Sequence, residues 1–208
     1  DITQRKAAES EIQRLAFYDP LTGLPNRRLL LDRLHKLVDA SPHSVEHGAI
    51  VFIDLDNFKT LNDNLGHETG DLLLKEVAQR LQAAVRRSDL VARLGGDEFT
   101  VILVDLESRV HVEDIAQKIL DELARPFELG DAHVHISASI GITLFPDDGT
   151  DQDHLVQNAD QAMYVAKNSG RNQFHFFTRA MQERALKRIT MMGDLRSALR
   201  HGELRLYF

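Results

Sequence analysis

Two aspartates at the end of one apolar segment could bind a cation. Asp54 and Asp56 stand two residues apart where the run "AIVFIDL" (49–55) ends. A nearly continuous apolar run of this length is typical of a strand that is buried on both faces. Because alternate residues of a strand share a face, both side chains point to the same side. Carboxylates in such a place are unfavourable unless they are paired or bound to a cation.

A second acidic pair follows two glycines in "RLGGDEFTVIL" (93–103). The Gly-Gly pair lies between two apolar runs and predicts a tight hairpin with Asp97 and Glu98 at its tip. If this hairpin lies beside the strand 49–55, the two acidic pairs converge and repel one another unless a divalent cation neutralises them. Mg²⁺ favours a few carboxylates together with substrate phosphates. The residue types therefore indicate metal-assisted phosphate chemistry.

A purely structural interpretation of the same acids stays open. Asp56 would cap the helix that follows the strand, and Asp97 and Glu98 would be ordinary turn acids. The pattern alone does not separate these two interpretations.

Phosphates would need cations and backbone amides at this site. The sequence has no G-x-x-x-x-G-K-[ST] loop and no G-x-G-x-x-G. Candidate cations are Lys59, Lys167 and Arg171. Lys167 and Arg171 lie near a predicted helix end, where the helix dipole alone also explains a cation. The ten histidines show no metal-ligand spacing, and G-x-S-x-G is absent.

Composition narrows the function classes. The chain has 208 residues, which suffices for one domain with flanking pieces. Its net charge of −7 provides no basic field, which argues against nucleic acid as a partner. It contains no cysteine, so disulfides and thiolate metal sites are excluded. No apolar stretch reaches the length of a membrane span, and no signal peptide is recognisable. These features favour a cytoplasmic location, with a membrane anchor in a longer parent protein left open.

The order of patterns predicts an α/β or α+β domain in which strands alternate with helices and hairpins. Strand patterns cover 49–55, the two arms of the hairpin, 133–146 and 173–177. Helical patterns cover 28–39, 71–87, 111–126, 151–170 and 179–201, while 56–71 carries turn signals. Residues 1–16 form a helical stripe that suits a connector. The chain begins without Met and ends on the strand-like "LYF", so we expect it to be part of a longer protein.

At this point the motifs resemble the GGDEF family, the diguanylate cyclases. "LGGDEF" (94–99) matches the family's signature. Further blocks of that family follow the same order here: "YDPLTGLPNR", "FIDLDNFKTLND", "GHETGD", "SIGI" and "AKNSGRN". The resemblance covers about residues 16–177. Upstream, "DITQRKAAE" resembles the exit of a PAS sensor domain, and downstream "LRSALRHGELRLYF" resembles the opening of an EAL phosphodiesterase domain.

The resemblance implies three segments and one reaction. Residues 1–16 would be a connector helix from an upstream sensor module, 17–178 the GGDEF domain, and 179–208 a linker helix with the start of an EAL domain. The fold would be a palm-like sheet, similar to nucleotidyl cyclases, flanked by helices. The activity would join two GTP molecules into cyclic di-GMP with release of two pyrophosphates. The partners would be GTP, cyclic di-GMP, a second copy in a transient homodimer, and covalently linked PAS and EAL domains.

The resemblance also assigns roles by position. The metal, Mg²⁺ or Mn²⁺, would be bound by Asp54, Asp97 and the backbone carbonyl of Leu55. Guanine would be read by Asn62 and Asp71, with His67 near the same nucleotide. Phosphates would be held by Lys59, which offsets charge on the transferring group, and by Lys167 and Arg171. Asp97 would be the base for the 3′-hydroxyl, and the sequence does not divide this role between Asp97 and Glu98.

One further spacing resembles the family's inhibitory product site. "RRSD" (86–89) contains Arg86 and Asp89. Arg can stack on guanine and donate two parallel hydrogen bonds to it. The structural alternative is an exposed arginine at a helix end and an aspartate before the next strand.

Two other functions stay open from the sequence. The chain could be a GTP-binding regulatory module that controls a following EAL domain without making product. A purely structural dimerisation domain is the third class, but it would not need Asp54, Lys59, Asn62 and Asp97 together.

Overall fold

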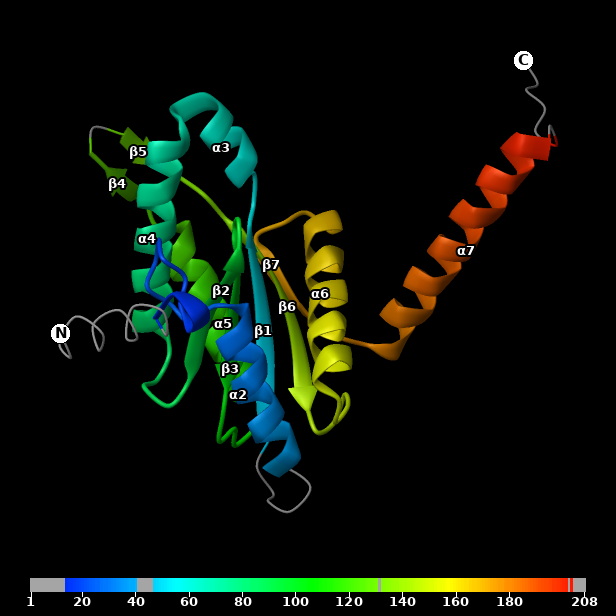
Figure 1. The fold of residues 1–208 in the computed structure, drawn as a ribbon, viewed down its shortest axis with the longest axis horizontal. Helices are drawn as coiled ribbons and strands as arrows, with labels where there is room; N and C mark the ends of the chain where they lie inside the picture. The colour runs from blue at the N-terminus through cyan, green and yellow to red at the C-terminus, as the bar shows by residue number, and fades with distance from the viewer. Residues whose placement is uncertain (1–13, 41–46, 131, 202, 204–208) are drawn as a thin grey trace, which may run out of the picture.

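The computed structural model describes residues 14–40, 47–130, 132–201 and 203 (Figure 1). Its strands are β1 (Gly48–Leu55), β2 (Leu90–Gly95), β3 (Glu98–Leu103), β4 (Phe127–Leu129), β5 (Ala132–Val134), β6 (Ala138–Phe145) and β7 (Gln173–Phe176). Its helices are α2 (Arg27–Ala40), α3 (Phe58–Leu65), α4 (His67–Ala84), α5 (Arg109–Ala124), α6 (Gln152–Asn168) and α7 (Arg179–His201).

A five-stranded sheet in the order β2-β3-β1-β6-β7 forms the centre of the domain, and β4 and β5 form a separate two-stranded ribbon. β1 is the middle strand and pairs antiparallel with both β3 and β6, whereas β7 joins β6 in parallel. All eight residues of β1 are buried. The predicted α/β (α+β) fold, a palm-like sheet flanked by helices, is confirmed.

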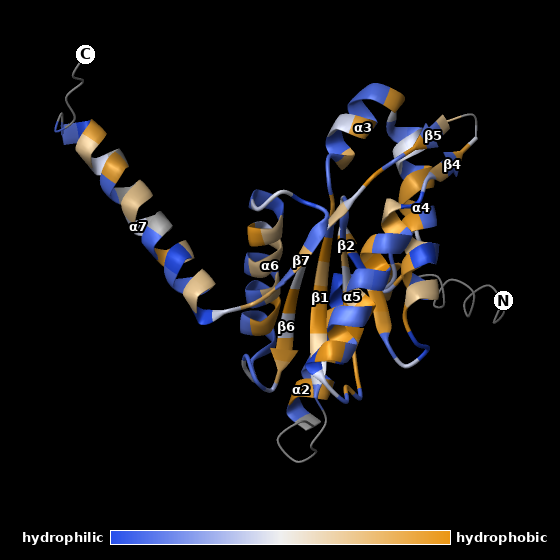
Figure 2. Ribbon diagram, turned by 180° about the vertical axis from the view of Figure 1, so that it is seen from behind, coloured by the Kyte–Doolittle hydropathy of each residue, from blue (hydrophilic) through white to orange (hydrophobic). Residues whose placement is uncertain are grey.

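Each face of the sheet is covered by a different pair of helices. α4 and α5 pack on the face that carries Val51 and Ile53. α2 and α6 pack on the face that carries Ile50 and Phe52. Figure 2 shows the apolar colour of the central strands between these helices. Because β1 alternates between two apolar layers, its polar end at Asp54 falls on the α2 and α6 side.

Gly141 of β6 lets α6 approach the sheet closely. A Cβ at this position would collide with the backbone of α6 at Ala159 and Met163. Only a glycine permits this contact between strand and helix backbones. The approach fixes α6 over β6, and α6 carries Lys167 near its end.

The sequence predictions for two segments were wrong in detail. The pattern at 133–146 predicted one strand, but the structure has β5 and β6 with an irregular stretch at 135–137 between them. Turn signals at 56–71 concealed α3, and α4 begins at His67 rather than at residue 71. α3 is a short helix that starts after Asn57, a residue in a left-handed conformation, and is followed by Gly66. It also contains Asn, Asp and Thr, which are common in turns, and for these reasons its sequence resembles a turn.

The two ends of the chain were predicted to be connectors. The predicted helix at 1–16 lies mostly outside the described residues, as does the strand-like end at 204–208. The helix predicted at 179–201 is confirmed as α7, which extends away from the sheet (Figure 1). In the described part of the chain, no helix combines the length and apolar character needed to cross a bilayer.

Candidate functional site

The acidic pairs do meet at one end of β1. Asp54 lies directly opposite Glu98 in the ladder between β1 and β3, and the N–H of Leu55 donates to the carbonyl of Asp97 at 3.3 Å. Directly opposite residues of a ladder share a face, so two like charges stand side by side here. Such a pair is destabilising unless something offsets it. The convergence of Asp54 with the hairpin acids, expected from the sequence, is confirmed.

Asp54 is a buried carboxylate with one cation beside it. Its side chain is 8% exposed, and Lys167 Nζ lies 2.7 Å from its Oδ1 in an ion pair. Among the described residues, Lys167 is the one group that contacts this oxygen, and no backbone N–H donates to it. Burial raises the pKa of Asp54 to about 6, Lys167 opposes the rise, and the charge of Asp97 adds to it.

Glu98 faces a cavity of about 490 Å³ between α2 and α6. Arg27 and Asp160 line the same cavity. Burial raises the pKa of Glu98 above its usual range, and the charges of Asp160 and Asp97 raise it further. Burial also raises the pKa of Asp160. No sequence pattern points to Asp160, because it is one polar residue among several in an amphipathic helix.

Asp56 differs from Asp54 because its carboxylate accepts several hydrogen bonds from other segments of the protein. It accepts hydrogen bonds from Ser137 Oγ at 2.6 Å, Ser139 Oγ at 2.7 Å and the N–H of Asn172 at 3.2 Å. Its N–H also donates to the carbonyl of Ser137 at 2.8 Å. The interpretation of Asp56 as a helix cap is therefore wrong, since no side-chain cap bond forms at α3 and Asp56 ties the end of β1 to two other segments.

Arg171 is held close to this tie. Its Nε lies 3.9 Å from Asp56 Oδ1, while its side chain is 53% exposed. Lys167 and Arg171 therefore both stand beside an aspartate at the end of β1 rather than serving the helix dipole alone. Their charges reach the same place as the acidic cluster, as phosphate binding would require.

The side chain of Asn62 lies against Gly70 in the first part of α4. A Cβ on Gly70 would collide with Asn62 Oδ1, so the side chain of Asn62 occupies the space that a larger residue would fill. Asn62 Oδ1 is buried and accepts no hydrogen bond within the described part of the chain. Asp71 follows Gly70 directly and is exposed. An amide oxygen without a partner and an exposed carboxylate are both groups that can accept from the N–H groups of a base.

Lys59 and His67 are less engaged. Lys59 lies in the first turn of α3 and His67 begins α4, and both are exposed. Within the described residues, no hydrogen bond or ion pair joins either of them to the acidic cluster. Their predicted roles stay predictions.

Arg93 and Asp19 hold the tip of the β2–β3 hairpin in place, and the sequence analysis did not identify this pair. Arg93 donates from Nε and Nη2 to the carbonyl of Gly96 at 3.1 and 2.8 Å, and from Nη1 to Asp19 Oδ1 at 2.9 Å. Asp19 also accepts from the hydroxyl of Thr22 at 2.6 Å. The turn-rich segment at 18–27 thus fixes the tip next to Asp97. The spacing of Asp19 and Thr22 signals a local turn, but nothing local points to Arg93.

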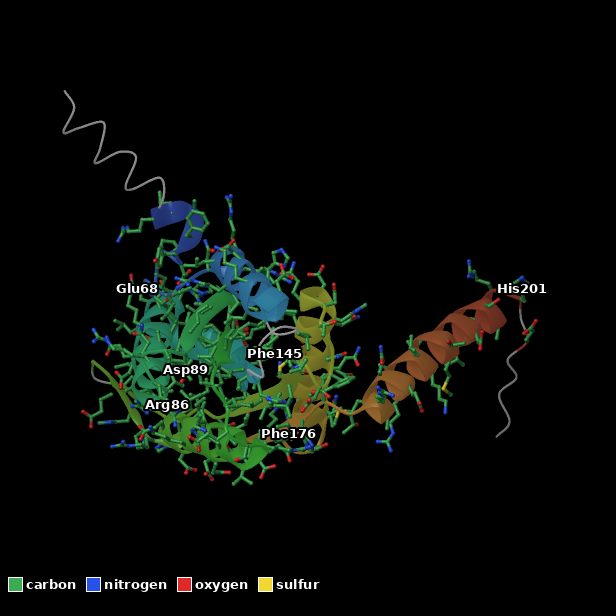
Figure 3. All side chains as sticks on the ribbon, turned by 90° about the horizontal axis from the view of Figure 1, so that it is seen from below. Glu68, Arg86, Asp89, Phe145, Phe176 and His201 are labelled. Carbon is green, nitrogen blue, oxygen red and sulfur yellow. The ribbon has the colours of Figure 1, made fainter. Side chains whose placement is uncertain are left out.

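Arg86 and Asp89 form a turn between α4 and β2 (Figure 3). Asp89 Oδ2 accepts from the N–H of Arg86 at 2.9 Å, and Oδ1 accepts from the N–H of Val104 at 3.3 Å. Asp89 therefore has the structural role that the sequence alternative described. The side chain of Arg86 is exposed, and its predicted role in a product site stays a prediction.

The donor set at the end of β1 fits a divalent cation. Asp54 is a buried carboxylate whose protein partner is the Lys167 ammonium, and the charge of Asp97 acts on it electrostatically. Oxygen donors of this kind suit Mg²⁺ or Mn²⁺. Among the described residues no three His, Asp or Glu side chains gather as a metal site. The predicted set contains only two carboxylates and a backbone carbonyl, so this finding does not conflict with it.

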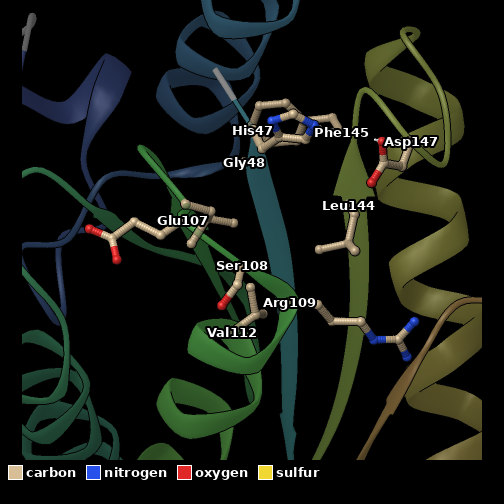
Figure 4. Close-up of a pocket in the computed structure, with 10 residues that line it drawn as sticks. His47, Gly48, Glu107, Ser108, Arg109, Val112, Leu144, Phe145 and Asp147 are labelled. Carbon is tan, nitrogen blue, oxygen red and sulfur yellow. Dashed lines mark ion pairs between the residues drawn. The ribbon is translucent and has the colours of Figure 1, made fainter. Parts of the chain in front are cut away.

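A cavity at the opposite end of β1 is separate from this site (Figure 4). It measures about 240 Å³ and is lined by Gly48, Phe145 and Arg109 among others. The guanidinium of Arg109 stacks on the ring of Phe176 at 3.9 Å. None of the predicted site residues lines this cavity in the described structure.

Comparisons with known proteins agree with this geometry. The family model "Diguanylate cyclase, GGDEF domain" matches residues 16–173. The chain is 43% identical over 206 residues to the bifunctional diguanylate cyclase/cyclic di-GMP phosphodiesterase MucR of Pseudomonas aeruginosa, covering 99% of this chain and 30% of MucR. The chain thus spans less than a third of that relative's length.

Two solved structures are similar in fold and sequence. A GGDEF domain of TpbB (YfiN) from P. aeruginosa superposes with a TM-score of 0.78 and 41% identity, covering 82% of this chain and 99% of that one. The coiled coil and GGDEF domain of DgcB from Caulobacter crescentus, in complex with c-di-GMP, gives a TM-score of 0.75 and 26% identity, covering 84% and 93%. With the ordered motifs and the acidic cluster at the end of β1, these matches place the chain in the GGDEF family of diguanylate cyclase domains.

Proposed function

We propose that this chain is a diguanylate cyclase domain that condenses two GTP into cyclic di-GMP and releases two pyrophosphates. The observation that carries the proposal is Asp54, a buried carboxylate opposite Glu98 whose Oδ1 is paired with the ammonium of Lys167. The protein maintains this unfavourable arrangement at the same place where Lys167 and Arg171 gather. Perturbed acids that converge with phosphate-binding cations are typical of a catalytic site.

The base would be read between α3 and α4. Asn62 Oδ1 supplies a buried acceptor and Asp71 an exposed carboxylate. Guanine presents neighbouring N–H donors, which these two acceptors complement, whereas adenine lacks that set. His67 begins the same helix and would lie near the nucleotide.

The phosphates would be held by the cations around β1. Lys167 and Arg171 would bind the terminal phosphates, with Arg171 oriented by Asp56. Lys59, from the first turn of α3, would offset the charge that develops on the transferring phosphate. Charge stabilisation and positioning are the main contributions that a protein makes to phosphoryl transfer.

The reaction forms a bond between the 3′-oxygen of one GTP and the α-phosphorus of the other, and the bond to pyrophosphate breaks. The 3′-hydroxyl proton would pass to the hairpin acids, Asp97 or its neighbour Glu98. GGDEF cyclases are generally metal-dependent, and here Asp54, Asp97 and the carbonyl of Leu55 would hold Mg²⁺ or Mn²⁺. The bound ion would neutralise carboxylate and phosphate charge.

The product requires two domains. Each domain would bind one GTP, and the ring closes when each 3′-hydroxyl attacks the other nucleotide, so the productive state is a two-fold homodimer. In the longer protein, residues 17–178 would form the cyclase domain, 1–16 would connect to a PAS module, and 179–208 would lead to an EAL domain. We place this protein in the cytoplasm, where GTP is available.

Arg86 and Asp89 would form an inhibitory site for the product. Arg86 presents an exposed guanidinium on a turn that Asp89 fixes. A guanidinium can bind the O6 and N7 edge of guanine with two hydrogen bonds.

The test is to incubate the purified chain with GTP and Mg²⁺ and to separate the products by chromatography. Formation of cyclic di-GMP by the wild type, with none from Asp54→Asn, supports the proposal. A chain that binds GTP but forms no cyclic di-GMP over a range of protein concentrations would instead be a regulatory module.

A further inference from the structure

Arg86 has a specific partner on a different element. Its Nη2 lies 3.0 Å from Nε2 of His111, which belongs to the first turn of α5. A guanidinium can only donate hydrogen bonds. Nε2 of His111 must therefore be the acceptor, so the imidazole in this contact is neutral and carries its proton on Nδ1.

His111 is itself held in place by its position in the helix. Ser108 caps α5, and its Oγ accepts from the N–H of His111 at 3.4 Å. His111 is half-buried, whereas Arg86 is exposed. The imidazole of His111 thus offers an acceptor with a fixed position to the end of the Arg86 side chain, which would otherwise sample many rotamers.

The contact uses only one of the five guanidinium N–H donors. In the part of the chain that the structure describes, the side chain of Arg86 makes no other hydrogen bond or ion pair. Among the described contacts, none joins the carboxylate of Asp89 to this guanidinium, and its two oxygens accept from the backbone N–H groups of Arg86 and Val104. His111 is therefore the group that sets the direction of the guanidinium, and it leaves most of the donors free.

We propose that His111 is the positioning residue of the product site, and that it orients Arg86 to receive the O6 and N7 edge of a guanine. This inference rests on the proposed product site at Arg86. By fixing the side chain before the ligand arrives, His111 reduces the ordering that binding would otherwise require. His111 thereby sets how much cyclic di-GMP is needed to occupy the site.

The test is calorimetric titration of cyclic di-GMP into the full 208-residue chain carrying single substitutions. His111→Gln can place its amide oxygen near the position of Nε2, whereas the shorter His111→Asn cannot reach it. We expect His111→Ala and His111→Asn to weaken binding about tenfold, and His111→Gln to stay close to wild type. Thermal unfolding of each variant verifies that it is folded, and cyclic di-AMP serves as the ligand without the guanine edge.

The outcomes separate the inference from the site on which it rests. If Arg86→Ala binds cyclic di-GMP like the wild type, the product site itself is wrong. If Arg86→Ala loses binding while His111→Ala keeps it, the product site stands and the role of His111 is wrong. Equal weakening by Ala and Gln at position 111 would show that packing of the ring, not its acceptor, matters, and would also overturn the inference.

Discussion

Lys167 Nζ stands 2.7 Å from Asp54 Oδ1, which couples the cation proposed to bind phosphate to the carboxylate proposed to bind metal. The two groups neutralise each other in the free chain. When substrate and metal are bound, each would have a new partner of opposite charge. The ion pair therefore keeps the side chains of Lys167 and Asp54 in place before either ligand is present.

The pKa of Asp54 predicts how stability depends on pH without metal. Burial raises this pKa from 3.8 to about 6, so between these values the folded chain keeps a proton that the unfolded chain releases. The contribution of Asp54 to the free energy of unfolding is thus present below about pH 4 and is lost as the pH rises through 6. Urea unfolding in the presence of a chelator should show that the free energy of unfolding of Asp54→Asn increases relative to that of the wild type as the pH rises from about 4 to about 6. At higher pH the difference between the two proteins should stay constant. A difference that does not change with pH would contradict the prediction.

Asp97→Asn should abolish cyclic di-GMP synthesis while the fold persists. The substitution removes a negative charge beside Asp54 and puts an amide at the base position. We expect turnover to fall by more than about 100-fold, as for loss of a positioned acid–base group. Initial rates and circular dichroism measure activity and fold, and Asp114→Asn, on an exposed position of α5, is the control. Turnover above a tenth of the wild-type value would exclude Asp97 from this role.

The pair of Asp19 and Arg93 should stabilise the hairpin tip. Their side chains are 17% and 10% exposed, so a double-mutant cycle with alanine should give a coupling of about 1–3 kcal/mol in urea unfolding. The exposed pair of Asp32 and Lys36 has a similar distance, 2.8 Å, and should give a clearly smaller coupling, because solvent screens exposed ion pairs. We also expect Arg93→Ala to lower kcat. Equal coupling in both pairs would mean that the tip is held by its own turn.

Local patterns were enough to predict the acidic cluster. An apolar run that ends in Asp54 and a Gly-Gly turn before Asp97 define two strand ends, and pairing of these strands brings the acids together. The two helix-covered faces also follow from the alternation along β1.

Contacts between distant segments could not be predicted in the same way. Asp56 accepts from the N–H of Asn172, which lies 116 residues away, and Arg93 meets Asp19 across 74 residues. Such partners depend on how the sheet orders its strands, which no local spacing encodes. Asp56 also continues the register of β1 and β6 by one residue, because its N–H donates to the carbonyl of Ser137 and its carboxylate accepts from the Ser137 hydroxyl.

Gly70→Ala should weaken GTP binding without removing any functional group. The added Cβ would collide with Asn62 Oδ1, so the amide must move away from its place against residue 70. We expect KM for GTP to rise about tenfold, with kcat less affected, since overpacking shifts neighbouring side chains. Glu68→Ala in the same helix is exposed and serves as the control. An unchanged KM would show that the position of Asn62 does not matter for substrate binding.

Specific activity should rise with protein concentration. The product contains two identical linkages, and each requires the 3′-hydroxyl of a nucleotide held by the other domain, so the rate depends on encounters between two loaded chains. If the free chain is mostly monomeric, the rate per chain increases with concentration until the dimer dominates. The measurement is initial rate over a concentration series, with sedimentation velocity to establish the oligomeric state. Mixing Asp97→Asn chains with wild type provides the control, because mixed pairs can form only one of the two linkages and excess variant should therefore suppress cyclic product. A constant specific activity from a chain shown to be monomeric would overturn the two-domain mechanism.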